Sequence, residues 1–168
     1  EKKKLNIFFG ETDKTKNQDI ILPSITKEVK LIRGMSDSAS LKKKFHNSSL
    51  HKKLSPIDEN QKKIFDELEN LRCEVLGSNK MPGIKKNITD FLELEIVKET
   101  KNEKKISKEK TLKFLLRDLL LKEKLSLKYK KKLDNIFKKA DSFLKNYKQD
   151  ISDFLNSQEQ FSKFINEL

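Results

Sequence analysis

Apolar residues alternate with polar ones near the start of the chain and recur every three or four residues beyond it. Alternation is typical of a strand with one buried face, and we expect strands at 5–9 and 20–22, paired as a β-hairpin that closes at Pro23. Two strands alone are marginally stable in water, so this arm has to lie on helices or on a partner. The pattern predicts a β-hairpin arm over 1–25 and a single helical domain over 26–168.

The three-to-four-residue spacing in the rest of the chain predicts amphipathic helices. In the first helix the expected inner stripe consists of Val29, Ile32, Ser36 and Ala39. Residues 46–54 are interpreted as a break. The second helix is expected to end at Gly77, since glycine is common just past a helix. The predicted fold class is mainly α, a bundle of about five to six helices with a short N-terminal β-hairpin arm. The helices are expected to begin at Thr26, Ser55, Pro82, Ser107, near Leu133 and at Ser157.

The chain is strongly basic, with 38 Lys and Arg against 26 Asp and Glu and a formal net charge of +12. Arg33, Arg72 and Arg117 are its only arginines, and lysine lacks the planar fork that reads base edges and grips phosphate at two points. We therefore interpret the lysines, including the run 122–132, as mainly solvated surface, and do not expect nucleic acid as the partner. A lysine-rich helical module that binds nucleic acid or an acidic protein segment stays open as the alternative.

The composition excludes several classes of protein. Cys73 is the single cysteine, so the chain can form neither an internal disulfide nor a cysteine-based zinc site. The four glycines do not have the spacing of a nucleotide-binding glycine loop. The longest apolar runs, among them 114–116 and 119–121, have three residues, and no signal peptide follows the charged start. We expect a cytoplasmic protein that does not span a membrane.

Few side chains suggest chemistry. His46 and His51 are the only histidines, and their spacing does not place them on one face of a helix, so we interpret them as hydrogen-bonded structural residues in a loop rather than metal ligands. Cys73 adjoins an apolar stripe without a base nearby in sequence, which favours a buried, inert thiol.

Four charged residues are expected to form a cluster between the first two helices. If these helices pack antiparallel, Arg33 and Asp37 fall opposite Glu69 and Arg72. We predict a partly buried ionic cluster that fixes the register of the two helices. The alternative is that the same residues form a contact between subunits.

The stretch 28–92 carries a characteristic series of residues. They are Arg33, Gly34, Asp37, Ala39, Leu41, His46, Leu50, His51, Leu54, Phe65, Glu69, Arg72, Glu74, Leu76, Gly77, Met81, Gly83 and Asn87. In order and spacing they resemble the amino-terminal region of the CobT-type subunit of aerobic cobaltochelatase. Asn47 stands where that family usually has aspartate. The family's acidic linker and carboxyl-terminal von Willebrand-type domain are not among the 168 residues.

The resemblance implies membership of a complex that inserts cobalt into hydrogenobyrinic acid a,c-diamide during cobalamin biosynthesis, an ATP-dependent ligase that forms nitrogen–metal bonds. Its large chelatase subunit holds the corrin ring, its AAA+ subunit hydrolyses ATP, and the CobT-type subunit couples the two. ATP, magnesium and cobalt are implied for the whole complex. In this chain we expect no catalytic, cofactor-binding or metal-binding residue, but an assembly domain that forms a homo-oligomer within the complex.

The resemblance also makes twelve of these residues candidates for family-specific packing or for interfaces. They are Arg33, Gly34, Asp37, His46, His51, Glu69, Arg72, Glu74, Gly77, Met81, Gly83 and Asn87.

Overall fold

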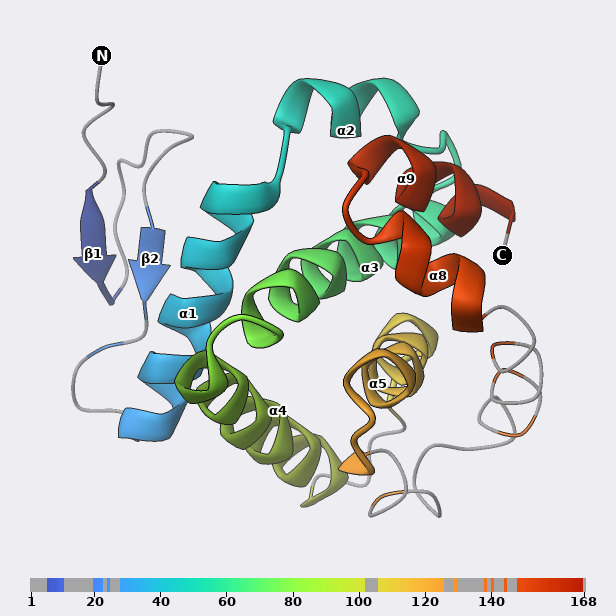
Figure 1. The fold of residues 1–168 in the computed structure, drawn as a ribbon. Coiled ribbons are helices and arrows are strands. Elements are labelled where there is room, and N and C mark those ends of the chain that lie inside the picture. The colour runs from blue at the N-terminus through green and yellow to red at the C-terminus, as the bar shows by residue number, and fades with distance from the viewer. Residues whose placement is uncertain are drawn as a thin grey trace.

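The protein is mainly α-helical, as the sequence predicts (Figure 1). The computed structural model describes residues 6–10, 20–22, 24, 28–101, 106–125, 129, 138, 140, 144 and 148–167. Its strands are β1 (Ile7–Phe9) and β2 (Ile20–Leu22). Its described helices are α1 (Val29–Phe45), α2 (Ser48–Leu54), α3 (Glu59–Ser78), α4 (Pro82–Lys101), α5 (Lys108–Leu121), α8 (Lys148–Phe154) and α9 (Gln158–Glu167).

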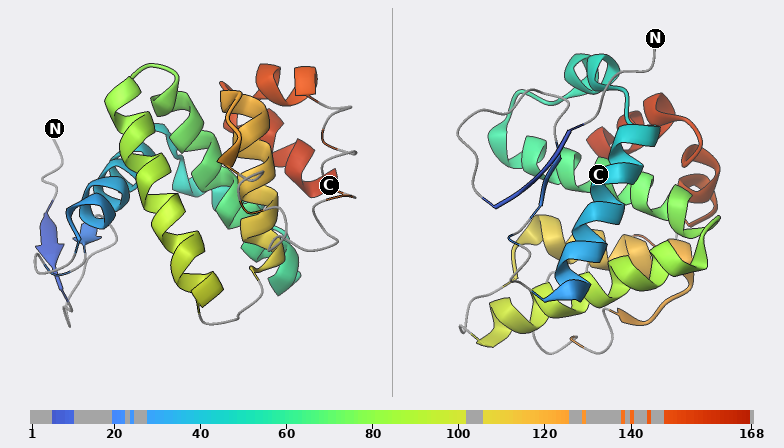
Figure 2. Two further views of the ribbon diagram at one scale, coloured as in Figure 1. Left: turned by 90° about the horizontal axis from the view of Figure 1, so that it is seen from below. Right: turned by 90° about the vertical axis from the view of Figure 1, so that its left-hand side faces the viewer.

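Helix α3 is the centre of the molecule. It contacts α1, α4, α5 and α9, and it runs through the middle of the ribbon in Figure 1. Because other helices surround it, every residue from Phe65 to Ser78 is buried or half-buried, including the charged ones. Figure 2 shows the β arm at one edge of the molecule and α8 and α9 at the opposite edge. No described helix has a stretch long and apolar enough to cross a membrane.

The two strands form where the sequence predicts them, but the expected hairpin is wrong. β1 and β2 are parallel, with Ile7 opposite Ile20 and Phe9 opposite Leu22. Alternating side chains determine which face of a strand is buried and not the direction of its neighbour. Hairpin loops usually have about two to five residues, and residues 10–19 separate these strands. Strand β2 packs on α1, which buries Ile20 and Leu22.

Helix α1 presents a different face from the one predicted. Its buried residues are Leu31, Gly34 and Leu41, whereas Val29 is 60% exposed. The stripe was misplaced because α1 packs mainly against α4, where Gly34 makes the close contact. Thr26, the expected cap, lies outside the described residues; the structure has Glu28 at the N-cap position.

The expected break at residues 46–54 contains helix α2, which Asn47 caps by accepting a hydrogen bond from the Leu50 amide. Helix α3 begins later than predicted, since Asp58 caps it and not Ser55. Gly77 does not end α3. It lies within the helix, buried against the side chain of Leu41, so its small size serves packing.

Other predicted helix ends are confirmed. Helix α4 begins at Pro82, Ser107 is the N-cap of α5, and Ser157 Oγ accepts a hydrogen bond from the Gln160 amide at the start of α9. The long helix expected over 133–155 and the lysine run 122–132 lie mostly outside the described residues, apart from α8 and a few single positions.

Candidate functional site

The most extensive buried polar contact in the described structure is centred on Arg72 of α3. Its guanidinium grips Glu69 at two points: Nε donates to Oε2 at 2.8 Å and Nη2 donates to Oε1 at 2.9 Å. The two residues are 2% and 1% exposed. Burial acts to lower the pKa of Arg72, but its hydrogen bond to Glu69 and the charge of Glu69 outweigh burial and raise that pKa. The Arg72 guanidinium therefore stays charged inside the protein.

Arg72 also joins segments that are distant in sequence. Nη2 donates to the carbonyl oxygen of Phe45 at 2.8 Å, and Nη1 donates to that of Leu155 at 3.1 Å. Phe45 is the last residue of α1 and Leu155 follows α8, where helix carbonyls lack intrahelical partners. We call Arg72, Glu69, His46 and these two carbonyl oxygens the Arg72 hub. It fastens the ends of α1 and α8 to the central helix.

His51 meets His46 at the edge of this hub. His46, at the C-cap of α1, donates from Nδ1 to Glu69 Oε1 at 3.0 Å, and His51 of α2 contacts Asp66 Oδ1 through Nε2 at 2.7 Å. Their ring centroids are 4.8 Å apart. The expected hydrogen-bonded role is confirmed, but the expected loop is wrong, since one histidine ends a helix and the other lies within one. Within the described part of the chain, no group of three or more His, Cys, Asp or Glu side chains could hold a metal ion.

Protonation of His46 makes stability depend on pH. Burial lowers the pKa of His46 below 6.5, although Glu69 acts to raise it. The unfolded chain then binds more protons than the folded one as the pH falls through 6.5, so the free energy of unfolding decreases there and levels off below the folded pKa. At pH 8 we expect the wild type to have a larger free energy of unfolding than His46→Asn. This difference, measured by urea unfolding, should become smaller between about pH 8 and pH 5, because only the wild type has a histidine to protonate at this position. A difference that is constant, or that grows as pH falls, contradicts this.

Cys73 is buried beside the hub, as predicted. Its side chain is 0% exposed. Burial, and then the negative charge of Glu69, raises the pKa of the thiol to about 12. The thiol therefore stays protonated at neutral pH, where it is a poor nucleophile.

The four-residue cluster expected between the first two helices is corrected. Arg33 is exposed on α1 and does not join Glu69 and Arg72. Asp37 accepts a hydrogen bond from Asn87 Nδ2 of α4 at 2.8 Å. The expectation treated α1 and α3 as a simple antiparallel pair. Helix α2 lies between them in sequence, and this face of α1 turns toward α4 instead. Only the Glu69–Arg72 half of the cluster forms.

Helix α9 is held at the same end of the molecule by the side-chain amide of Gln158, which forms two hydrogen bonds with the backbone of Asn47. Gln158 Oε1 accepts from the Asn47 amide at 2.7 Å, and Gln158 Nε2 donates to the Asn47 carbonyl oxygen at 3.0 Å. Asn47 links α1 to α2, so this pair of bonds holds the C-terminal helix on the segment next to the hub.

Removing this pair should loosen α9. We expect Gln158→Leu to lower the free energy of unfolding by about 1–2 kcal/mol, because two hydrogen bonds are lost and the Asn47 amide loses its acceptor. The Asn47 carbonyl oxygen keeps the His51 amide as a donor. Hydrogen exchange of the α9 amides should speed up. Gln160→Leu, an exposed change two residues further along the same helix, is the matched control. Equal exchange in the two variants would mean that Gln158 does not hold α9.

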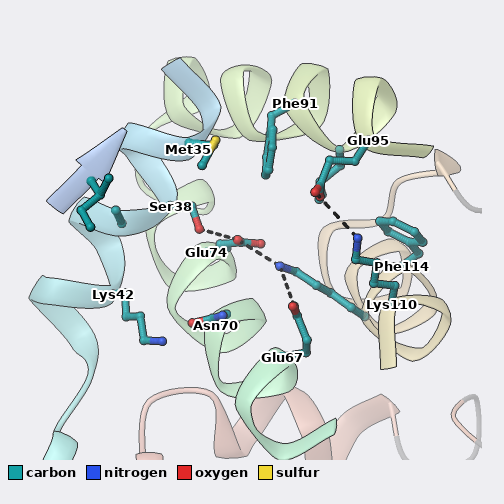
Figure 3. A pocket seen from close by; sticks show the side chains of 14 residues that line it. Met35, Ser38, Lys42, Glu67, Asn70, Glu74, Phe91, Glu95, Lys110 and Phe114 are labelled. Carbon is teal, nitrogen blue, oxygen red and sulfur yellow. Dashed lines mark hydrogen bonds and ion pairs between the residues drawn. The ribbon is translucent and has the colours of Figure 1, made fainter. Parts of the chain in front are cut away.

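A second polar cluster lies in a cavity of about 260 Å³ between α1, α3, α4 and α5 (Figure 3). Lys113 of α5 extends to Glu74 Oε1 at 3.2 Å and to Glu67 Oε2 at 3.3 Å. Ser38 of α1 donates to the same Glu74 oxygen at 2.6 Å. Burial acts to lower the pKa of Lys113, but the charges of Glu74 and Glu67 outweigh it and raise that pKa. Lys113 is therefore a buried cation.

The remaining candidates have mainly packing positions. Gly34 lies against Phe91 of α4, and Met81 packs against the core. Gly83 is exposed, with open space where a side chain would extend. Whether any of the twelve candidates contacts a partner stays a prediction.

Sequence reasoning missed two buried cations on α5. Lys113 contacts Glu74, and Arg117, which is 0% exposed, pairs with Glu123 and donates to Thr89 Oγ1 at 2.8 Å. The sequence did carry a signal for them. Lys113 and Arg117 are four residues apart, on the side of α5 that carries its buried leucines. A charge inside an apolar stripe is almost always paired.

Comparison with known families supports the resemblance found in residues 28–92 and extends it. The family model described as cobalamin biosynthesis protein CobT matches residues 2–168, which is nearly the whole chain. No solved structure matches the chain significantly. Because this match covers nearly the whole chain, the chain belongs to the CobT family of cobalamin biosynthesis proteins.

Proposed function

We propose that the chain is a non-catalytic assembly and coupling domain of a cobaltochelatase, the complex that inserts cobalt into hydrogenobyrinic acid a,c-diamide. It binds the AAA+ ATPase subunit and carries that subunit's movements to the large chelatase subunit, working as a homo-oligomer within the complex. Family membership supplies the pathway.

The observation that carries the coupling role is the Arg72 hub. A domain that transmits displacement must move as one body, and the hub joins α1, α3 and the end of α8 through buried, charge-assisted hydrogen bonds. Gln158 adds α9 to this body. The buried charges of the hub are paired with one another and with backbone, which suits a structural task.

The chemistry is assigned to the partners. ATP and magnesium belong to the ATPase subunit and the corrin ring to the large subunit, and cobalt is the substrate. This chain is proposed to hold none of them.

Binding to the ATPase subunit tests the proposal. The purified chain and the cognate AAA+ subunit are mixed at micromolar concentration and passed over a size-exclusion column with ATP, with ADP and without nucleotide. Co-migration is expected in at least one nucleotide state. A chain that elutes alone in all three contradicts the proposal.

An open groove favours a second candidate function, the binding of an acidic protein segment. The groove lies beside His46 and His51 and is lined by three exposed lysines, Lys42, Lys52 and Lys62. A glutamate-rich peptide should bind there with an affinity that falls steeply with salt, and mixed-sequence duplex DNA should bind less well. No peptide binding at low salt would set this candidate aside.

A further inference from the structure

The charged side chains that line the cavity between α1, α3, α4 and α5 range from fully buried to partly exposed. Its floor is formed by Glu74 and Lys113, whose side chains are 2% and 9% exposed. At its rim, Glu67, Glu95 and Lys110 are 31%, 32% and 28% exposed. The cavity therefore opens to solvent over a buried, charged floor, with side chains from the four helices pointing into it (Figure 3).

Only one of the two carboxylate oxygens of Glu74 accepts hydrogen bonds from described residues. Its Oε1 accepts from both Ser38 and Lys113. Its Oε2 is buried and accepts no hydrogen bond from any described residue. The amide oxygen of Asn70, one turn earlier on α3 and also in the cavity lining, likewise has no donor in the described part of the chain. A buried acceptor without a donor is costly, so both oxygens are suited to a group that brings N–H donors.

The charges that line the cavity balance overall, with Glu67, Glu74 and Glu95 against Lys42, Lys110 and Lys113, but they are unevenly placed. Lys113 carries one positive charge between the two carboxylates of Glu67 and Glu74, which leaves the trio one negative charge in excess. The rim pair, Lys110 and Glu95, is neutral at a separation of 3.8 Å. Lys42 also lines the cavity, but it is exposed to water, where its charge is screened. The two carboxylates that share Lys113 therefore favour a cation over a neutral group beside Glu74.

The walls above the floor are apolar and adaptable. Met35 of α1, Phe91 of α4 and Phe114 of α5 surround the carboxylate in Figure 3. Ile21 of β2, which is 48% exposed, completes this lining on the side of the arm. Aromatic faces attract cations, and methionine fits irregular shapes. At about 260 Å³ the cavity is slightly smaller than common ligand pockets, so it suits a compact group.

We propose that this cavity binds a guanidinium or ammonium group carried on a short apolar stem. The cationic N–H groups pair with Glu74 Oε2 and reach Asn70, while the stem packs on Met35, Phe91 and Phe114. The group belongs either to a free small molecule or to the arginine or lysine side chain of a partner protein. This inference does not depend on the proposed coupling function.

Titration of the whole chain with n-butylguanidinium tests the site. Amide shifts in ¹H–¹⁵N spectra are expected to cluster around Ser38, Glu74 and Lys113 and to saturate. Pentanamide, which has a similar stem but no charge, should bind at least about tenfold more weakly. Shifts scattered over the surface, or none up to millimolar concentration, would mean that the cavity holds water only, and would overturn the proposal.

Three variants locate the binding. Glu74→Gln should weaken n-butylguanidinium binding at least about tenfold. Glu59→Gln removes the same charge from an exposed position on the same helix and should leave binding unchanged. Ala39→Leu keeps Glu74 but fills part of the cavity with a larger side chain from α1, so it should abolish the binding of n-butylguanidinium. Circular dichroism checks that each variant is folded. Equal affinity of Glu74→Gln and Glu59→Gln, or unaltered binding by folded Ala39→Leu, would overturn the proposal.

The blocked peptide acetyl-Gly-Arg-Gly-amide separates the two sources of the ligand. If the peptide causes the same shifts as n-butylguanidinium, the site accepts a side chain from a partner protein. If only n-butylguanidinium binds, the ligand is a free small molecule. Either result, together with loss in Glu74→Gln, supports the site.

Discussion

Replacement of Arg72 by methionine is expected to lower the free energy of unfolding by about 3–5 kcal/mol. The change leaves the Glu69 carboxylate buried without its counter-ion, and it removes the donors to the Phe45 and Leu155 carbonyl oxygens. A buried charge that loses its partner keeps the full cost of its desolvation. Urea unfolding followed by circular dichroism measures the effect.

Two further variants separate the hub from a general effect of losing arginine. Arg33→Met, at an exposed position on α1, should change stability by no more than about 0.5 kcal/mol. Adding Glu69→Met to Arg72→Met should recover part of the loss, because no unpaired charge is then left. If Arg72→Met and Arg33→Met have similar stability, the hub does not hold the fold together.

Gly34→Ala should destabilise the protein by about 1–3 kcal/mol, even though alanine is the better helix former. A Cβ at this position would overlap Phe91 Cβ and lie 2.7 Å from the backbone oxygen of Asn87. Neither atom is the end of a flexible side chain, so α1 and α4 would have to move apart. Thermal unfolding measures the loss.

Gly83→Ala is the matched control for this substitution. Gly83 lies in the first turn of α4, on the partner helix, and nothing lies within 4 Å of an added Cβ. Alanine there should keep or raise the stability by up to about 1 kcal/mol. If Gly34→Ala and Gly83→Ala had the same melting temperature, the stability of the protein would not depend on the close approach of α1 and α4 at Gly34.

What the sequence could predict depended on local signals. Regular apolar spacing identified α3, α4, α5 and α9, and the i, i+3 spacing of Glu69 and Arg72 put one half of the ionic cluster in reach. Helix α2 was missed because none of its residues is buried, so it has no apolar stripe, and its only strong signal was the cap Asn47. Strand direction was missed because alternation is the same in both directions.

The candidate sites depended on contacts across the chain. Ser38 meets Glu74 across 36 positions and Lys113 meets it across 39, and no local pattern encodes such pairings. The placement of Arg33 failed for the same reason, because it required knowing how α1 turns against α3 and α4. Lys113 and Arg117 gave a partial signal as charges within the inner stripe of α5, but not the identity of their partners.

The most direct test of the coupling role follows cobalt insertion and ATP hydrolysis together in a mixture of the ATPase subunit, the large chelatase subunit and this chain. We predict that cobalt insertion requires the chain. When the chain is left out, the ATPase subunit should still hydrolyse ATP, but the mixture of the two other subunits should insert no cobalt. Insertion at the same rate when the chain is left out, or no insertion when it is added, would contradict the proposal.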